Sequence, residues 1–68
     1  MKIGFIGLGR MGFNLVLNLK DKHVGVITHN RSLIPLKKIK KHHVEVAYTV
    51  PELMRKLPKQ KIVWLMVT

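Results

Sequence analysis

The chain has 68 residues, enough for one small domain, and such a domain buries only about 60% of the surface its unfolded form exposes, so we expect marginal stability. The chain has no cysteine, which excludes a disulfide framework and a thiolate metal site. Thirteen Lys and Arg residues against three acidic residues give a formal net charge of +10, typical of a solvated basic face or of a surface that attracts phosphates, nucleic acid or anionic membrane.

Strand-like and helix-like segments alternate along the chain. We predict strands at residues 2–7, 24–28, 44–47 and 61–67, and helices at 10–22, at 33–41 and from Thr49 to just before Pro58. The strands are nearly continuous apolar runs with β-branched residues, a pattern typical of parallel strands covered on both faces. With right-handed crossovers, this order predicts an α/β fold, βαβαβαβ, with a parallel sheet of about four strands in the order 3-2-1-4.

Apolar spacing indicates which helix residues face the sheet. The expected inward residues are Met11, Leu15, Val16 and Leu19 in the first helix and Leu33, Leu36 and Ile39 in the second. In the third helix, Thr49 can cap a first-turn amide while Glu52 reaches back to the amide of Thr49, as in a capping box. We expect Met54 and Leu57 in the core and Trp64 packed beneath a helix.

The segment after the first strand, Gly7-Leu8-Gly9-Arg10-Met11-Gly12, matches the pattern G-x-G-x-x-G. Gly7 would allow the tight turn, Gly9 the close approach of a pyrophosphate, and Gly12 the close packing of helix on strand. The free amides at the positive end of the helix dipole would then hold the phosphates. Because the motif joins a buried strand to an amphipathic helix, it predicts a dinucleotide-binding site in a partial Rossmann fold.

The second predicted strand ends in Thr28-His29-Asn30-Arg31-Ser32, with no acidic residue nearby. An NAD-binding domain needs an Asp or Glu there to accept hydrogen bonds from the ribose hydroxyls. Arg31 can instead form charge-assisted hydrogen bonds to a 2′-phosphate, with Asn30 and Ser32 as neutral donors beside it and a lysine at 37 or 38 adding charge. Ser32 can equally be a helix N-cap. The pattern favours NADP over NAD.

With these motifs in place, the whole chain resembles the N-terminus of the 6-phosphogluconate dehydrogenase family, which belongs to the β-hydroxyacid dehydrogenase superfamily. The matching segments are Gly7-Leu8-Gly9-Arg10-Met11-Gly12-Phe13-Asn14-Leu15 with Leu17-Asn18, Asn30-Arg31-Ser32, Tyr48-Thr49-Val50 and Leu65-Met66-Val67. The continuation Met-Gly-x-Asn-Leu-x-Leu-Asn is more specific than the glycines, because related hydroxyisobutyrate-type dehydrogenases usually lack it.

The resemblance implies a role for each matching residue. It implies that the pyrophosphate lies on Gly7, Leu8, Gly9, Arg10, Met11 and Gly12, with Met11 near the nicotinamide. It places the 2′-phosphate on Asn30, Arg31 and Ser32, and it has Val67 and Thr68 begin a loop that touches the cofactor.

The resemblance also implies the parent reaction, in which 6-phosphogluconate is oxidised by NADP and loses carbon dioxide to give ribulose 5-phosphate. The family's catalytic lysine, its asparagine partner and its substrate-binding residues fall beyond Thr68. We therefore expect 6-phosphogluconate to bind only through the remainder of such an enzyme. The 68 residues alone are expected to hold no catalytic residue and to be inactive.

One alternative is a stand-alone basic module that binds nucleotides or nucleic acid without catalysis. The lysine-rich run 37–41 has no interleaved aromatic residues for stacking on bases, so a solvated helix face explains it better. His42 and His43 lie in a loop without an acidic residue or cysteine, which does not favour a metal site. Ser32 is the only serine, which argues against a Ser-His-Asp arrangement.

The surroundings and assembly of the protein give two further expectations. The longest apolar run, residues 62–67, is too short to span a bilayer, and the N-terminus does not have the pattern of a signal peptide. We therefore expect a cytoplasmic protein without a membrane partner. The strand at 61–67 would have an open edge, through which we expect two copies of the chain to pair.

Overall fold

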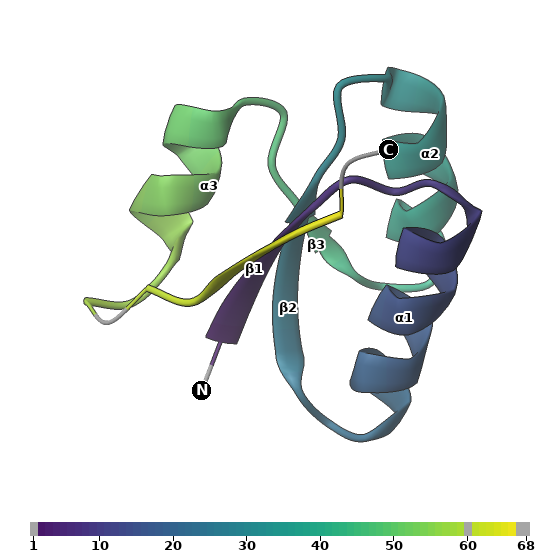
Figure 1. The fold of residues 1–68 in the computed structure, drawn as a ribbon, viewed down its shortest axis with the longest axis horizontal. Helices are drawn as coiled ribbons and strands as arrows, with labels where there is room; N and C mark the ends of the chain where they lie inside the picture. The colour runs from purple at the N-terminus through teal and green to yellow at the C-terminus, as the bar shows by residue number, and fades with distance from the viewer. Residues whose placement is uncertain (1, 60, 67–68) are drawn as a thin grey trace.

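Within residues 2–59 and 61–66, which the computed structural model describes, four parallel strands alternate with three helices (Figure 1). The elements are β1 (Lys2–Ile6), α1 (Arg10–Asp21), β2 (Gly25–His29), α2 (Leu33–Lys40), β3 (Glu45–Val46), α3 (Val50–Lys56) and β4 (Val63–Leu65). The strand order is β3-β2-β1-β4, with every neighbouring pair parallel. The predicted α/β class and strand order are therefore confirmed.

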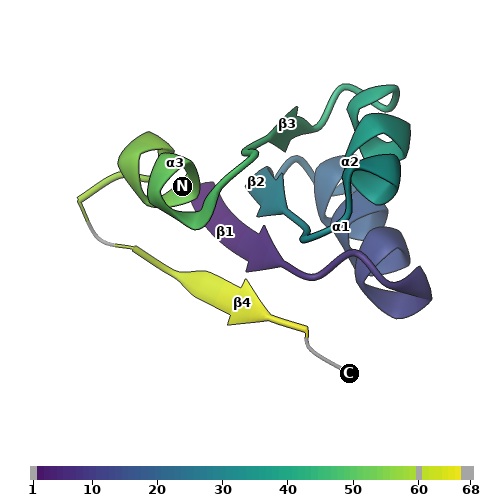
Figure 2. The same ribbon diagram turned by 90° about the horizontal axis from the view of Figure 1, so that it is seen from above.

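The strand register brings the carboxyl ends of β1, β2 and β4 to one edge of the sheet. Ile6, the last residue of β1, pairs with His29 of β2 and with Leu65 of β4. Helices α1 and α2 cover one face of the sheet and α3 covers the other (Figure 2). The chain changes face between β3 and β4, so the edge beside β1 is the topological switch point, where ligands bind in sheets of this kind.

Each face of the sheet has its own hydrophobic core. The core under α1 and α2 comprises Ile3, Phe5, Leu8, Val16, Val26, Leu36, Ile39, Val44 and Val46. The core under α3 comprises Ile27, Ala47, Leu53 and Leu57, with Met54 partly buried against it. Alternation along the strands explains the division, because successive side chains point to opposite faces. The polar side chain of Thr28 is fully buried and donates to the carbonyl oxygen of Phe5 at 3.0 Å.

Three residues expected in the core are exposed. Met11 is 72% exposed and Leu33 is 54% exposed, because each lies in the first turn of its helix, where the helix has not yet reached the sheet. Trp64 is 50% exposed and does not pack beneath a helix. It lies on the edge strand and stacks on Phe5 with ring centroids 6.0 Å apart. The spacing of apolar residues predicted which side of each helix faces the sheet, but it cannot indicate how far the sheet extends beneath that helix.

The start of α3 differs from the predicted capping box by one residue. Thr49 Oγ1 accepts from the amide of Glu52 at 3.1 Å, as predicted. Glu52 Oε1, however, accepts from the amide of Tyr48 at 2.6 Å, so the predicted bond to the amide of Thr49 is wrong. This hydrogen bond, with help from the charge of Lys56, lowers the pKa of Glu52 below its ordinary value. The carboxylate thus satisfies an amide just before the helix.

Two further findings concern the last strand and the helices. β4 spans only Val63–Leu65, shorter than the predicted 61–67, although the amide of Met66 still donates to the carbonyl oxygen of Ile6 at 2.8 Å. Val67, the predicted end of that strand, lies outside the described residues.

Among the helices of the described residues, none has both the length and the apolar character needed to cross a membrane.

Candidate dinucleotide-binding site

The turn after β1 requires glycine at its first position. Gly7 has a φ of +105°, a conformation that residues with a side chain rarely adopt. A Cβ at Gly7 would also overlap the backbone carbonyl of Met66, which follows β4. The amide of Gly7 donates to the carbonyl oxygen of His29 at 3.0 Å, so the turn is tied to the end of β2. Glycine is therefore required at this position, because any side chain would push the loop away from the segment that follows β4.

The other two glycines of the motif differ in what surrounds them. A Cβ at Gly12 would overlap the carbonyl oxygen of Gly7 and lie 3.2 Å from the ring of Phe5, so Gly12 allows α1 to pack closely on the loop. A Cβ at Gly9 would meet nothing within 4 Å, and Gly9 has an ordinary φ of −65°. Packing thus accounts for Gly7 and Gly12 but gives no reason for glycine at position 9. Close approach of a ligand to the backbone does give one.

Gly9 is also the N-cap of α1. No side chain caps this end of the helix, in contrast to α3, where Thr49 does. The first amides of an α-helix have no intrahelical acceptor, and they carry the positive end of the helix dipole. The first turn of α1 contains no acidic residue that would compete for them. A pyrophosphate fits this arrangement of donors.

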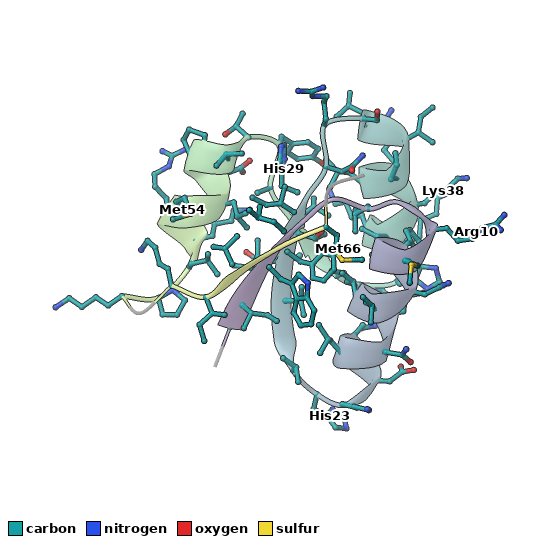
Figure 3. The ribbon with its side chains drawn as sticks, viewed as in Figure 1. Arg10, His23, His29, Lys38, Met54 and Met66 are labelled. Carbon is teal, nitrogen blue, oxygen red and sulfur yellow. The ribbon has the colours of Figure 1, made fainter. Side chains whose placement is uncertain are left out.

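An open pocket of about 610 Å³ lies at the carboxyl edge of the sheet, a size typical of small-molecule and cofactor sites. Its lining residues come from the glycine loop, the end of β2, the starts of α2 and α3, and the segment after β4: Ile6, Gly7, Leu8, Gly9, His29, Asn30, Arg31, Pro35, Val50 and Met66. Figure 3 shows His29 and Met66 near this edge. The pocket therefore occupies the switch point beside β1.

Asn30 joins the two loops of the pocket. Its Oδ1 accepts from the amide of Leu8 at 2.8 Å, and its Nδ2 donates to the carbonyl oxygen of Ser32 at 3.1 Å. The side chain therefore holds the glycine loop against the β2–α2 loop and leaves one amide hydrogen directed elsewhere. The sequence suggested only a donor role for Asn30, because a contact between residues 22 positions apart is not visible in a local pattern.

The structure brings together some of the predicted site residues and separates others. Of these residues, Gly7, Leu8, Gly9, Asn30 and Arg31 line the pocket. Arg10 lies in an adjoining depression, and Ser32 is the N-cap residue of α2 without a side-chain capping bond. Met11 is exposed on the first turn of α1, and Gly12 is buried beneath that turn. Val67 and Thr68 lie outside the described residues.

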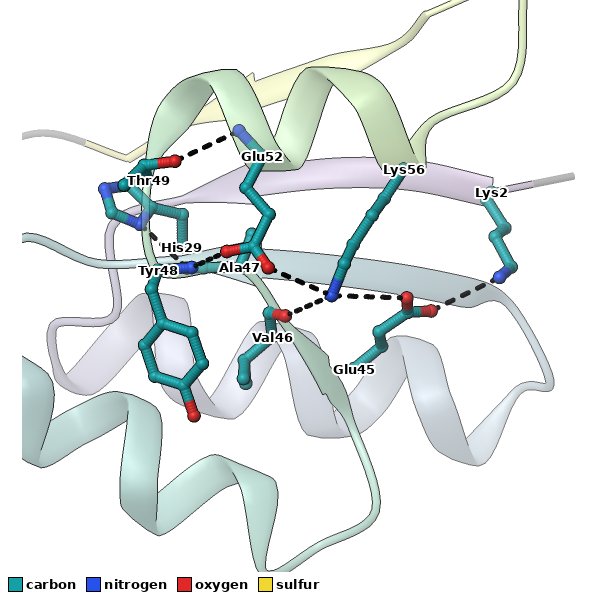
Figure 4. Close-up of polar contacts among 9 residues, drawn as sticks. All are labelled: Lys2, His29, Glu45, Val46, Ala47, Tyr48, Thr49, Glu52 and Lys56. Atoms are coloured by element: carbon teal, nitrogen blue, oxygen red, sulfur yellow. Dashed lines mark hydrogen bonds and ion pairs between the residues drawn. The ribbon is translucent and has the colours of Figure 1, made fainter.

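Sequence reasoning missed five lining residues, which are Ile6, His29, Pro35, Val50 and Met66. His29 Nδ1 lies 2.9 Å from the carbonyl oxygen of Ala47, which fixes the ring against the β3–α3 connection (Figure 4). His29 and Met66 follow directly from the register, because each is at or just beyond the end of a strand next to β1. Their position at the end of a predicted strand was therefore the feature of the sequence that could have identified them as lining residues.

The acidic residues are distant from the pocket or already paired. Glu45 pairs with Lys2 at 3.3 Å and with Lys56 at 3.8 Å, and Glu52 pairs with Lys56 at 3.5 Å (Figure 4). Asp21 is the last residue of α1, at the opposite end of the helix from the glycine loop. Among the described residues that line the pocket there is no carboxylate, while Arg31 contributes a positive charge. The pocket is thus suited to an anion.

The doubly covered parallel sheet, the glycine turn and the uncapped helix at the switch point define a dinucleotide-binding domain of the Rossmann type. Residues 2–68 match the family model of the NAD binding domain of 6-phosphogluconate dehydrogenase. The chain therefore belongs to this family, and its expected resemblance and nicotinamide dinucleotide cofactor are confirmed. The match does not favour the alternative of a stand-alone nucleic-acid module.

The chain is also similar to proteins named 6-phosphogluconate dehydrogenase, decarboxylating. It is 37% identical over 70 residues to the one from Aggregatibacter actinomycetemcomitans and 37% identical over 70 residues to the one from Haemophilus influenzae. The one from Haemophilus ducreyi is 36% identical over 70 residues. Each alignment covers 96% of this chain but only 14% of the relative, so the chain corresponds to a small part of such a protein.

Proposed function

We propose that this domain binds NADP in preference to NAD. The observation that carries the proposal is Arg31, which lines the pocket just beyond the end of β2, where an NAD-binding domain has a carboxylate. A carboxylate at this position would repel a 2′-phosphate, whereas a guanidinium group forms charge-assisted hydrogen bonds with it. In the proposed complex, Asn30 and Ser32 donate beside Arg31.

The other proposed contacts to the cofactor come mainly from the glycine loop after β1. The pyrophosphate lies against residues 7–12 and takes hydrogen bonds from the uncapped amides at the start of α1. In the same proposal, Met11 lies near the nicotinamide, and Val67 and Thr68 contact the cofactor. The bound cofactor supplies the hydride acceptor, while the residues of this domain bind and orient it.

We infer that the parent protein is a cytoplasmic NADP-dependent dehydrogenase of the pentose phosphate pathway. It would oxidise 6-phosphogluconate and release carbon dioxide to form ribulose 5-phosphate. The names of the relatives support the dehydrogenase and decarboxylation parts of this inference. The residues that bind the substrate and those that catalyse the reaction would lie in the much larger part of those proteins that this chain does not match.

The cofactor preference is tested by titrating NADPH and NADH against the protein and against Arg31→Ala. A hydrogen bond to a charged group contributes about 1.5–3 kcal/mol, so the substitution should weaken NADPH about 10- to 100-fold. Its effect on NADH should be much smaller. Arg55→Ala, an exposed arginine on α3, is the matched control and should leave both affinities unchanged. Equal affinity of the unmutated protein for the two nucleotides would contradict the proposal.

The 68-residue chain alone should not catalyse the parent reaction. The described residues bring no acid–base pair to the glycine loop, and the pocket lining contains no carboxylate or lysine. We expect no increase in absorbance of the reduced nicotinamide when the pure chain is mixed with NADP and 6-phosphogluconate. Turnover that co-purifies with the chain and disappears in Arg31→Ala would show that catalytic groups lie within these residues.

A further inference from the structure

A second depression adjoins the pocket on the side of α1 and α2. Its volume is about 320 Å³, and it is lined by Leu8, Arg10, Phe13, Asn14, Ile34, Pro35 and Lys38. It shares the residues Leu8 and Pro35 with the first pocket, so the two hollows are contiguous. Most of its lining residues are apolar, and each of its two cationic side chains comes from a different helix.

The two cations are not used elsewhere in the described fold. Among residues 2–59 and 61–66, the ion pairs involve the lysines at positions 2 and 56, and neither Arg10 nor Lys38 has an acidic partner. Figure 3 shows Arg10 and Lys38 on the same side of the molecule. Like charges that line one depression repel each other unless an anion lies between them. The depression therefore favours a compact group with negative charge.

We propose that Arg10 and Lys38 form the second half of the 2′-phosphate site and, with Arg31, determine the preference for NADP. This inference rests on the proposed function. Arg31 lines the first pocket and the other two cations line the second, and the residues Leu8 and Pro35 are shared by both. A phosphomonoester held where the two hollows meet would face a cation on each side.

The chemistry of the two side chains fits this role. A phosphomonoester presents three oxygen acceptors and carries a charge close to −2 at neutral pH, more than one guanidinium neutralises. Arg10 offers a planar fork for two oxygens, and Lys38 offers a compact charge on a flexible stem. The amide of Asn14, at the same depression, is a neutral donor.

The test compares Arg10→Ala, Lys38→Ala and the double variant with the unmutated protein. Removing these side chains leaves the backbone amides of α1 in place, so contacts to the pyrophosphate are kept. Each charged contact accounts for roughly tenfold in affinity, and we expect the double variant to bind NADPH about 10- to 100-fold more weakly. NADH should change less than about twofold under the same conditions, because it lacks the phosphate that these contacts recognise.

Controls separate this effect from net charge and from folding. The double variant Lys40→Ala/Arg55→Ala removes the same charge from exposed positions outside both depressions and should bind NADPH normally. Circular dichroism and thermal unfolding should match those of the unmutated protein, since Arg10 and Lys38 are both exposed. As isolated probes, 2′-AMP should bind more weakly to the Arg10/Lys38 double variant, and 5′-AMP should bind equally to both proteins.

The outcomes distinguish the inference from the function on which it rests. If the unmutated protein binds neither nucleotide, or binds both equally, the proposed function fails. If it prefers NADPH and the double variant keeps that preference, Arg31 alone determines it and the inference is overturned. Equal weakening of NADPH and NADH in the double variant also overturns the inference, because it would place the two cations on the pyrophosphate.

Discussion

Replacing Gly7 by alanine should unfold the domain or come close to doing so. The φ of +105° costs a residue with a side chain about 1–3 kcal/mol, and the added Cβ would overlap the carbonyl of Met66 on the segment after β4. Relieving that overlap would separate β4 from β1. We expect a loss of at least about 3 kcal/mol, a large part of the 5–15 kcal/mol that stabilises an ordinary domain. Urea or thermal unfolding followed by circular dichroism measures it.

Gly9→Ala is the matched control for this substitution. Gly9 has a φ of −65° and room for a Cβ, but it is the N-cap of α1, where glycine is favoured over alanine. The lower entropy of the unfolded variant offsets this loss, so the stability of Gly9→Ala should stay within about 1 kcal/mol of the unmutated protein. Its affinity for NADPH should nevertheless fall at least tenfold, because the methyl group lies where the pyrophosphate approaches the backbone. Unchanged stability in Gly7→Ala, or unchanged NADPH affinity in Gly9→Ala, would contradict these assignments.

The second large effect should be self-association of the isolated chain through β4. This strand hydrogen-bonds β1 on one side and, in the described part of the chain, has no strand on the other (Figure 2). Its exposed apolar side chains are Trp64 and Leu65, at 50% and 61% exposure, with Ile62 just before it at 50%. Unpaired edges of this kind are templates for pairing, and charge repulsion is screened beyond about 8–10 Å at 0.1–0.15 M salt.

Sedimentation at rising concentration and at two salt levels tests the association. Leu65→Lys should weaken it about tenfold or more, since burying a leucine contributes about 1.5–3 kcal/mol and each 1.4 kcal/mol is tenfold. Leu33→Lys adds the same charge at a leucine that is 54% exposed on α2 and should weaken it much less. A monomer at hundreds of micromolar, or equal effects of the two substitutions, would show that β4 is not the interface.

The topology could be predicted from the sequence because each element depends on local patterns. Apolar strands separated by amphipathic helices allow few arrangements once crossovers are right-handed. The glycine motif was equally local, and the structure gives a steric reason for Gly7 and Gly12. The cap at Thr49 was predicted for the same reason, because the side chain and the amide that it caps are three residues apart.

What could not be predicted depends on distances between segments. The exposure of Met11, Leu33 and Trp64 is determined by where the sheet ends beneath each of them. The contact between Asn30 and the amide of Leu8 requires β1 and β2 to be in their observed register. The same register brings His29 into the pocket, and its position at the end of β2 was the only indication of this in the sequence.

Because Asn30 bonds to both loops of the site, we expect the two loops to move together. Its side chain accepts from Leu8 of the glycine loop and is followed directly by Arg31, so motion of one loop displaces the other. In the proposed complex, occupation of the pyrophosphate subsite would reduce the conformational entropy still to be lost at the ribose subsite. Coupling is reciprocal, so a ligand that fills only the ribose end would prepare the glycine loop by the same free energy. We therefore expect the two ends of one dinucleotide to bind as a cooperative pair.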